Sequence, residues 1–546
     1  MRSGLLTSVA LIALSLGSQP VFAQVAADAP AISGKVSAAN KAAMEGVVVS
    51  AKKGIVTVSV TSNSKGEFSF PASKIGAGEY AISVRAVGYN LDGPKKINVE
   101  SGKASALDVK LVKTRNLASQ LTNLEWMLSA PGTDDQKRSL TGCTNCHSVE
   151  RIMSSSYNAD EFLDVIKRMA QYSNNSFYKK PQIRAEVRDI NRFVPNADKV
   201  AAYLATINRS EGERNWELQT LPRVSGDGTR AIVTEYDLPE QTIQPHDVMV
   251  DADGTTVWHS DFSGQMLGRF DTKTLEHKAF AVPLQRQGWP TGGLDLEPDP
   301  EGNIWLSLMF QSGAAKFDRK TEKFTMIQLP PELIQADSQQ ALIGPQNLTV
   351  DNKLWMQDPA RRAIYRRDMA SGKTELFEPF AKTPGSPYSV VSDKQNNAWF
   401  LDFGGQNIGK IDAKTTQITL FPTPTKRSRP RRGRMDDNDV VWFAEFGGER
   451  VGSFDTKSET FREWEVPGKF FAPYDAMTDK TGHVWTAGMN ADRVLRMDIA
   501  TGKFTEYQLP RYTNVRRIYV DNSQAKPVLW IGNNHGASII KLEPLD

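Results

Sequence analysis

Two cysteines and one histidine carry the most specific chemical pattern in this sequence. Cys143, Cys146 and His147 stand in the order C-x-x-C-H, which is typical of c-type haem attachment. Two thiols at this spacing can each add to a vinyl group of one porphyrin, and the adjacent histidine then lies under the iron as its proximal ligand. A C-x-x-C redox pair and half of a zinc site are the alternatives, but the chain has no further cysteine for a zinc site. The pattern therefore predicts one covalent haem c.

The second axial ligand of this predicted iron has two candidates. Met169 lies on the apolar face of a helix that Asn158 caps, with Glu161 three residues on, and a methionine ligand would raise the reduction potential. Met153 follows His147 by only six residues, which is too near the attachment turn to cross the porphyrin easily. A Met169 that only packs in the core and an open distal site are the alternatives. We therefore expect His147 and Met169 to bind the metal.

The elements that must hold this motif are predicted to be helices. Apolar residues recur at helical spacing before the motif, at Leu121, Leu124 and Leu128, and again after it, between Val200 and Ile207. The stretch is similar to a single cytochrome c domain. We therefore expect a small all-α cytochrome c domain over residues 114–212.

An alternating pattern precedes these helices. Short runs such as Gly66–Phe70 and Tyr80–Val84 alternate apolar and polar residues between turn residues, which predicts a β-sandwich over residues 31–113. The series Ile32-Ser33-Gly34-Lys35-Val36, Gly66-x-Phe68, Gly78-x-Tyr80 and Val87-Gly88-Tyr89 resembles the carboxypeptidase regulatory-like family. The resemblance implies a non-catalytic accessory domain that acts as a spacer or docking module.

The last part of the chain repeats. Seven tryptophans are separated by 47, 50, 44, 43, 43 and 45 residues, and six of them are followed by an aspartate 13 residues on. The tryptophans are Trp258, Trp305, Trp355, Trp399, Trp442, Trp485 and Trp530. A period in the forties with short alternating strands predicts one four-stranded propeller blade per repeat. We therefore expect a seven-bladed β-propeller over residues 230–546, in a multidomain and mainly β chain.

The ring is predicted to close between its two ends. Most repeats end in a strand such as Thr505–Pro510, but the seventh has none, and an unpaired copy, Thr234–Pro239, precedes the first repeat. If this copy supplies the outer strand of the last blade, both loose edges disappear. The repeats resemble virginiamycin B lyase (streptogramin lyase) propellers, and Trp442-Phe443-Ala444-Glu445 is the closest copy of their Trp-Phe-x-Glu segment.

The first strands of the blades should bring polar residues to the central channel. The residues that follow the blade-opening prolines include His246, Tyr388, Arg431 and Tyr474, and the positions three residues after each tryptophan include several carboxylates. In the lyase family, two Pro-His positions, a Pro-Tyr position and a glutamate build a magnesium-assisted elimination site. This chain has Pro-His only at His246, with His535 as a possible second imidazole. We predict His246 as a base, with Tyr388, Tyr474 and Arg431 orienting a substrate; a divalent metal ion near His246 is the lyase alternative.

A basic run crosses the same region. Lys426 to Arg434 holds six basic residues in nine, with Arg431 and Arg432 at the channel position. Guanidinium groups bind carboxylates in bidentate fashion, so an anionic substrate, cofactor or partner is one interpretation and a solvated loop is the other.

The N-terminal segment and the charge balance predict the location and the partners of the protein. Arg2, the apolar run Leu5–Leu16 and Val21-Phe22-Ala23 form a secretory signal over residues 1–23, and no later run is long enough to span a membrane. Sixty-six basic and 63 acidic residues exclude nucleic acid as the main partner. We expect a periplasmic haem c-linked oxidoreductase whose haem passes electrons from an unidentified small-molecule substrate to a redox partner. A carbon–oxygen lyase and a non-catalytic binding or docking protein are the alternatives.

Overall fold

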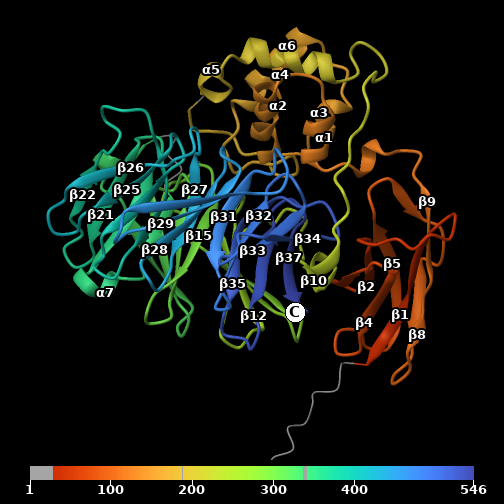
Figure 1. Cartoon of the computed structure of the whole chain (residues 1–546). Coiled ribbons are helices and arrows are strands. Elements are labelled where there is room, and N and C mark those ends of the chain that lie inside the picture. Colours follow the sequence, from red (N-terminus) through yellow and green to blue (C-terminus); the bar gives the residue numbers. More distant parts are fainter. Residues whose placement is uncertain (1–28, 187, 336–340, 546) are drawn as a thin grey trace, which may run out of the picture.

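Three parts make up the chain. The computed structural model describes residues 29–186, 188–335 and 341–545, so the predicted signal at residues 1–23 lies outside the described residues. A β-module at the N-terminus stands beside a ring of sheets, and a helical segment lies across one face of the ring (Figure 1).

The N-terminal module is a β-sandwich, as the alternating pattern predicts. One sheet has the strand order β4-β1-β9-β6, with β8 beside β1, and β3, β2, β5 and β7 lie together in the other. Along β5, inward side chains such as Tyr80 and Ile82 alternate with exposed ones. The strands are β1 (Pro30–Ala38), β2 (Val48–Lys53), β3 (Val56–Thr61), β4 (Glu67–Pro71), β5 (Gly78–Arg85), β6 (Tyr89–Leu91), β7 (Lys96–Val99), β8 (Ser105–Ala106) and β9 (Val109–Lys113).

The ring consists of seven four-stranded antiparallel units, and each repeating tryptophan lies on the second strand of its unit. Blades 1 to 3 are β11 (Pro245–Val250), β12 (Thr256–Asp261), β13 (Met266–Asp271), β14 (His277–Ala281); β15 (Gly293–Pro298), β16 (Ile304–Leu308), β17 (Gly313–Asp318), β18 (Lys323–Gln328); and β19 (Ala341–Gly344), β20 (Lys353–Asp358), β21 (Ala363–Asp368), β22 (Thr374–Phe377). Blades 4 to 6 are β23 (Pro387–Ser392), β24 (Ala398–Asp402), β25 (Asn407–Ile411), β26 (Ile418–Pro422); β27 (Pro430–Met435), β28 (Val440–Glu445), β29 (Arg450–Asp455), β30 (Thr460–Glu465); and β31 (Pro473–Thr478), β32 (His483–Gly488), β33 (Arg493–Asp498), β34 (Phe504–Gln508). Blade 7 is β35 (Val515–Asp521), β36 (Val528–Asn533), β37 (Ser538–Pro544) and β10 (Ala231–Asp237). The turns η3 (Gly226–Thr229) and η4 (Pro331–Leu333) and the helix α7 (Leu348–Asp351) lie outside the sheets.

The two ends of the ring join as predicted. Strand β10 pairs antiparallel with β37 from Ala231 opposite Pro544 to Asp237 opposite Ser538. The other side of β10 pairs with β3 of the N-terminal module, so one sheet runs without a break from blade 7 into the module. The edge that closure would have left free is therefore covered by the module.

The helical segment lies over the ring and shares its core. Its helices are α1 (Asn123–Ser129), α2 (Asp134–Ser139), α3 (Glu150–Met153), α4 (Ala159–Met169), α5 (Ile190–Phe193) and α6 (Ala197–Ile207), with 3₁₀ turns η1 (Ala118–Gln120) and η2 (Leu140–Asn145). Capping boxes begin α1, α2 and α4. Buried Leu124 and Trp126 belong to the same apolar cluster as Phe470 and Leu495 around blade 6.

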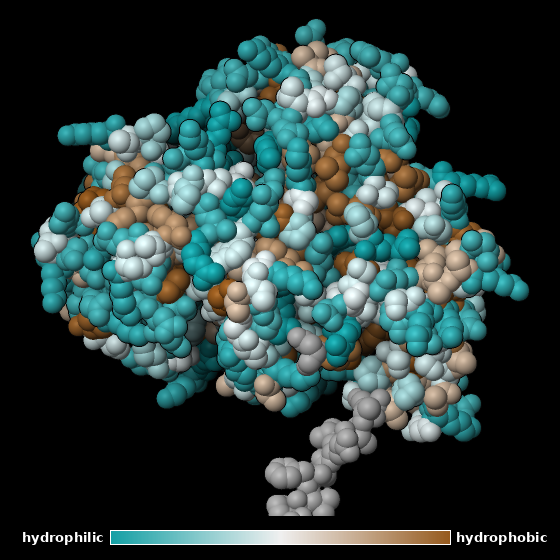
Figure 2. Space-filling model, in the orientation of Figure 1, coloured by the Kyte–Doolittle hydropathy of each residue, from teal (hydrophilic) through white to brown (hydrophobic). Residues whose placement is uncertain are grey.

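A separate all-α cytochrome c domain over residues 114–212 is therefore not evident. The helices are short, and the cluster that buries their apolar sides includes residues of the ring. Apolar surface is also visible where the helical segment meets the rest of the molecule (Figure 2). In the part of the chain that the structure describes, no helix is long and apolar enough to cross a membrane.

Candidate functional site

Four predicted residues meet near the axis of the ring. His246, Tyr388, Arg431 and Tyr474 each follow the proline that opens the first strand of blade 1, 4, 5 or 6. The pairing register of each of these strands shifts just after the proline. A proline has no backbone N–H for the ladder, and a bulge turns the next side chain away from the regular pleat. The local sequence thus explains why these side chains come together at the axis.

A chain of hydrogen bonds links three of them. The hydroxyl groups of Tyr388 and Tyr474 are 2.7 Å apart, and the Tyr474 hydroxyl is 3.4 Å from Nε2 of His246. Nδ1 of His246 is 2.5 Å from Oδ1 of Asp247. Burial lowers the pKa of His246 to about 3, although Asp247 opposes the shift. The imidazole is therefore neutral at pH 7, and both of its nitrogens have partners.

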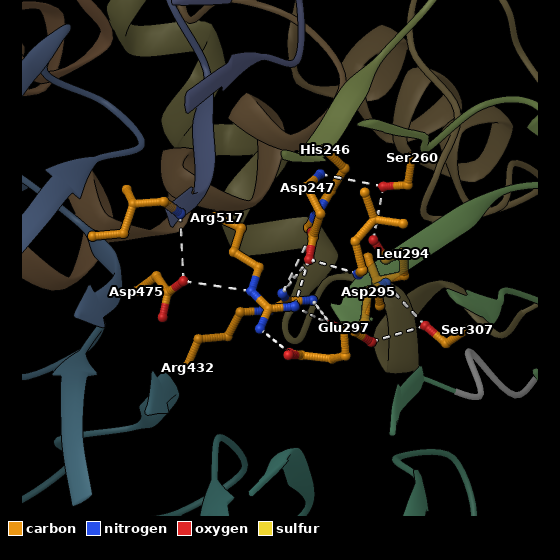
Figure 3. A network of polar contacts seen from close by, with 12 residues as sticks. His246, Asp247, Ser260, Leu294, Asp295, Glu297, Ser307, Arg432, Asp475 and Arg517 are labelled. Carbon is orange, nitrogen blue, oxygen red and sulfur yellow. Dashed lines mark hydrogen bonds and ion pairs between the residues drawn. The ribbon is translucent and has the colours of Figure 1, made fainter. Parts of the chain in front are cut away.

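Asp247 belongs to a buried network of acids and arginines (Figure 3). Arg517 lies 2.6 Å and Arg432 lies 3.3 Å from Oδ2 of Asp247, and Arg432 is 2.8 Å from Asp295. Arg517 also contacts Glu297. Burial alone would raise the pKa of Asp247, but the two guanidinium groups outweigh burial and hold that pKa well below its usual range. Arg432, which the sequence offered as an anion ligand, is thus already paired inside the protein.

Two other buried arginines have no such partner. Arg431 is 6% exposed and Arg516 is 2% exposed, and among the described residues neither has a carboxylate oxygen within 4 Å. Four aromatic rings surround the Arg431 guanidinium, with centroids 3.8 to 5.0 Å away: Tyr474, Phe446, Phe403 and Tyr388. Nε of Arg431 has no hydrogen-bond partner. Ring faces attract a cation but do not neutralise it.

The two tyrosines respond to this positive charge in opposite ways. Burial would raise the pKa of Tyr388, but Arg431 and Arg432 outweigh burial, so this pKa lies below its usual value. For Tyr474, burial prevails and raises the pKa to about 12. Of this hydrogen-bonded pair, Tyr388 is therefore the stronger acid.

The predicted second ring of carboxylates serves the backbone instead. Asp261 accepts hydrogen bonds from the backbone N–H groups of Gln244 and Ser263, and Asp402 accepts one from Ser386. Glu445 is different, because neither of its carboxylate oxygens has a hydrogen-bond partner. Burial, together with Glu463, raises the pKa of Glu445 to about 9.

Sequence reasoning missed Asp247, Asp295, Arg516 and Arg517. Asp247 and Arg432 both stand one residue after a channel position, and Asp475 occupies the same place in blade 6. Comparing the residue directly after each channel position in all blades would have predicted this second layer of charged residues.

The helical segment covers the axis at blades 1, 2 and 7. Arg516 donates a hydrogen bond to the backbone carbonyl of Asn145 at 2.9 Å, and Asn514 donates one to that of Thr144 at 3.1 Å. On the other side, Gln182 exchanges hydrogen bonds with the backbone of Thr291 at 2.8 and 2.9 Å. Thr291 of blade 2 and Asn514 of blade 7 thus hold the helical segment in place.

One of the residues predicted to bind a haem, His147, lines a cavity. His147 borders a cavity of about 560 Å³ between the helical segment, the module and blade 7, but neither cysteine nor Met169 is part of its wall. Burial raises the pKa of Cys143 to about 12 and that of Cys146 to about 11, so both thiols are protonated at pH 7. Haem attachment at these residues stays a prediction of the sequence pattern.

The other predicted ligands are dispersed. Met153 is fully buried in the shared apolar cluster, and His535 donates from Nε2 to the Asn145 carbonyl at 3.1 Å if that nitrogen carries the proton. In the basic run, the side chain of Arg427 is 86% exposed, whereas Arg431 and Arg432 are buried. Among the described residues, no group of three or more His, Cys, Asp or Glu side chains is arranged to hold a metal ion.

Comparison with known proteins identifies two parts of the chain. Residues 229–487 match the virginiamycin B lyase family, and residues 31–112 match the carboxypeptidase regulatory-like domain. The propeller is lyase-like. A streptogramin B lyase structure superposes with a TM-score of 0.50 at 20% identity, over 59% of this chain and 100% of that one. No curated protein sequence matches this chain.

Two further structures are similar. Virginiamycin B lyase from Staphylococcus aureus aligns at 20% identity over 57% of this chain and 99% of its own, with a TM-score of 0.49. YCF48 bound to D1 peptide aligns at 15% identity over 57% and 97%, with a TM-score of 0.44. The family match and the streptogramin B lyase structure point to a lyase-like propeller and not to a cytochrome, so the prediction of a c-type cytochrome that couples substrate oxidation to electron transfer is wrong. The lyase and binding alternatives agree better with these findings.

Proposed function

We propose that this chain is a binding protein whose propeller holds a small anionic molecule at the ring axis, between Arg431 and Arg516. The observation that carries the proposal is the pair of buried guanidinium groups without a carboxylate partner. A buried charge is strongly unfavourable unless an opposite charge accompanies it. Three neighbouring arginines have carboxylate partners within the protein: Arg432, Arg434 and Arg517. Arg431 and Arg516 are therefore the ones to which a bound anion could pair.

The test is titration calorimetry with malonate, at constant ionic strength, against the uncharged malonamide. The wild-type protein should bind malonate and not malonamide, and Arg431→Gln should weaken malonate binding at least tenfold, which is about 1.4 kcal/mol. Arg427→Gln is the matched control, because Arg427 lies in the same basic run but is exposed. Absence of malonate binding by the folded wild-type protein, or equal binding by Arg431→Gln, would overturn the proposal.

Lyase chemistry at the same axis is the second candidate. The family match favours it, and so does the hydrogen bond between Asp247 and His246. In many enzymes a carboxylate orients a histidine base in this way. The residues do not fit a metal-assisted version, because both His246 nitrogens have protein partners. If the protein is a lyase, His246→Gln should abolish conversion of its substrate while malonate binding persists. A wild-type protein that binds malonate but converts no substrate supports the binding function instead.

A further inference from the structure

Arg431 is in contact with an acidic group, although that group is not a carboxylate. The Tyr388 ring centroid lies 5.0 Å from the Arg431 guanidinium, so the phenol and the cation are close neighbours. A phenol that loses its proton becomes an anion. Tyr388 can therefore supply a negative charge beside Arg431, which has no carboxylate partner among the described residues.

Three arginines near Tyr388 favour this ionisation. Arg431 and Arg432 approach it from β27, the latter at 5.8 Å from the ring, and Arg516 approaches from β35. Tyr474 of β31 lies 2.7 Å from the Tyr388 oxygen and can donate a hydrogen bond to it. Beyond Tyr474 stands His246 of β11, which is neutral.

The surroundings keep water away from the phenol. Tyr388 is only 8% exposed and packs with Phe262, Leu294, Met309 and Phe310. Charges that lie close together in such a buried, poorly solvated site interact more strongly than charges at the surface, because the effective dielectric constant is lower. Burial would raise the pKa of Tyr388, but the Arg431 and Arg432 guanidinium groups outweigh burial and lower it.

We propose that Tyr388 is the acid–base group of the axial site: above the midpoint of its ionisation, its phenolate balances Arg431 while the site is empty, and it takes up one proton when an anion binds. This inference rests on the proposed function. The proton comes from solvent, or from the ligand itself when the ligand is a weak oxyacid; in that case the acid's O–H bond breaks, the conjugate base pairs with Arg431, and the proton joins the Tyr388 oxygen. Binding of an anion therefore weakens by up to tenfold per pH unit once Tyr388 is ionised.

Ultraviolet titration tests the acid strength of Tyr388 without any ligand. Tyrosinate absorbance near 295 nm should show one tyrosine that ionises before the rest, and Tyr388→Phe should remove that early phase. Tyr365→Phe is the matched control, because burial and the hydrogen-bonded Asp358 carboxylate both raise the pKa of Tyr365. An early phase that persists in Tyr388→Phe, or no early phase at all, would overturn the inference.

Calorimetry then tests the coupling. Malonate is titrated at one pH, above the midpoint of the early phase, in two buffers of different ionisation enthalpy, which measures the protons taken up per anion bound. The wild type should take up close to one proton, and Tyr388→Phe should bind malonate with none. Equal proton uptake by the two proteins would overturn the inference. If neither binds malonate, the proposed function fails and the inference that rests on it fails too, while the ligand-free titration still reports whether Tyr388 is acidic.

Discussion

Individual side chains at the ring axis differ in how their charge is balanced. Asp247 lies between two guanidinium groups, whereas Arg431 lies among aromatic rings. Aromatic contacts stabilise a cation by about 0.5–2 kcal/mol, which is less than the cost of burying an unpaired charge. Arg431 therefore needs an anionic group beside it, which is the Tyr388 phenolate in the empty site and the bound molecule in the occupied one.

Glu445 shows the same principle for an acid. Its carboxyl group is buried without hydrogen bonds, and its pKa is raised from 4.5 to about 9. Between these two values the folded protein keeps a proton that the unfolded chain releases, so stability falls as pH rises from about 4.5 to about 9. Glu445→Gln should therefore raise the melting temperature at pH 8 and change it little at pH 4.

Calorimetric melting curves of both proteins across this pH range provide the measurement. One pKa unit corresponds to about 1.4 kcal/mol, so the gain at pH 8 should exceed about 1 kcal/mol. Glu465→Gln is the control, because the Glu465 side chain is 75% exposed and should leave the pH dependence unchanged. A Glu445→Gln protein with wild-type pH dependence would contradict the expectation.

At the scale of the element, two aspartates explain the blade repeat. The one 13 residues after the tryptophan closes the turn to the last strand: Asp412 accepts hydrogen bonds from the backbone N–H groups of Lys414 and Thr415. The other precedes the tryptophan: Asp393 accepts from the indole of Trp399 at 2.9 Å and from the backbone of Asn397. The sequence predicts the repeat and the strands from spacing alone. The role of Asp393 is visible only once the turn brings it to the indole.

These two aspartates should differ in importance. Asp393→Ala leaves the buried indole N–H of Trp399 and nearby backbone N–H groups without acceptors, which should cost about 2–3 kcal/mol of unfolding free energy. In Asp412→Ala, water can accept the hydrogen bonds that the carboxylate accepted, because this turn lies at the surface. The loss of unfolding free energy should therefore be clearly smaller. Urea unfolding of both variants measures the difference, and equal losses would show that the indole contact adds nothing.

The whole molecule is organised by contacts that no local pattern reveals. The period of the tryptophans predicts the ring and its closure, and alternation predicts the module. The pairing of β10 with β3 joins segments some 175 residues apart, and neither strand carries a signal for its partner. The axial site was predicted in part for the same reason: the proline positions repeat, whereas the acids that pair with Arg432 and Arg517 depend on how blades 1, 2 and 6 face each other across the channel.

The shared sheet should make the module and the ring unfold together. Val58 of β3 is 4% exposed, pairs with Thr234 of β10 and belongs to the apolar cluster that includes Ile232 of the same strand. Val58→Asp buries a carboxylate at this junction, which should cost several kcal/mol. Scanning calorimetry of the wild type should show the module and ring in one transition, and Val58→Asp should lower that whole transition. Ile55→Asp, at a 38% exposed position beside the same strand, should leave the transition nearly unchanged. Two separate transitions, of which only the smaller responds to Val58→Asp, would mean that the continuous sheet does not couple the two parts.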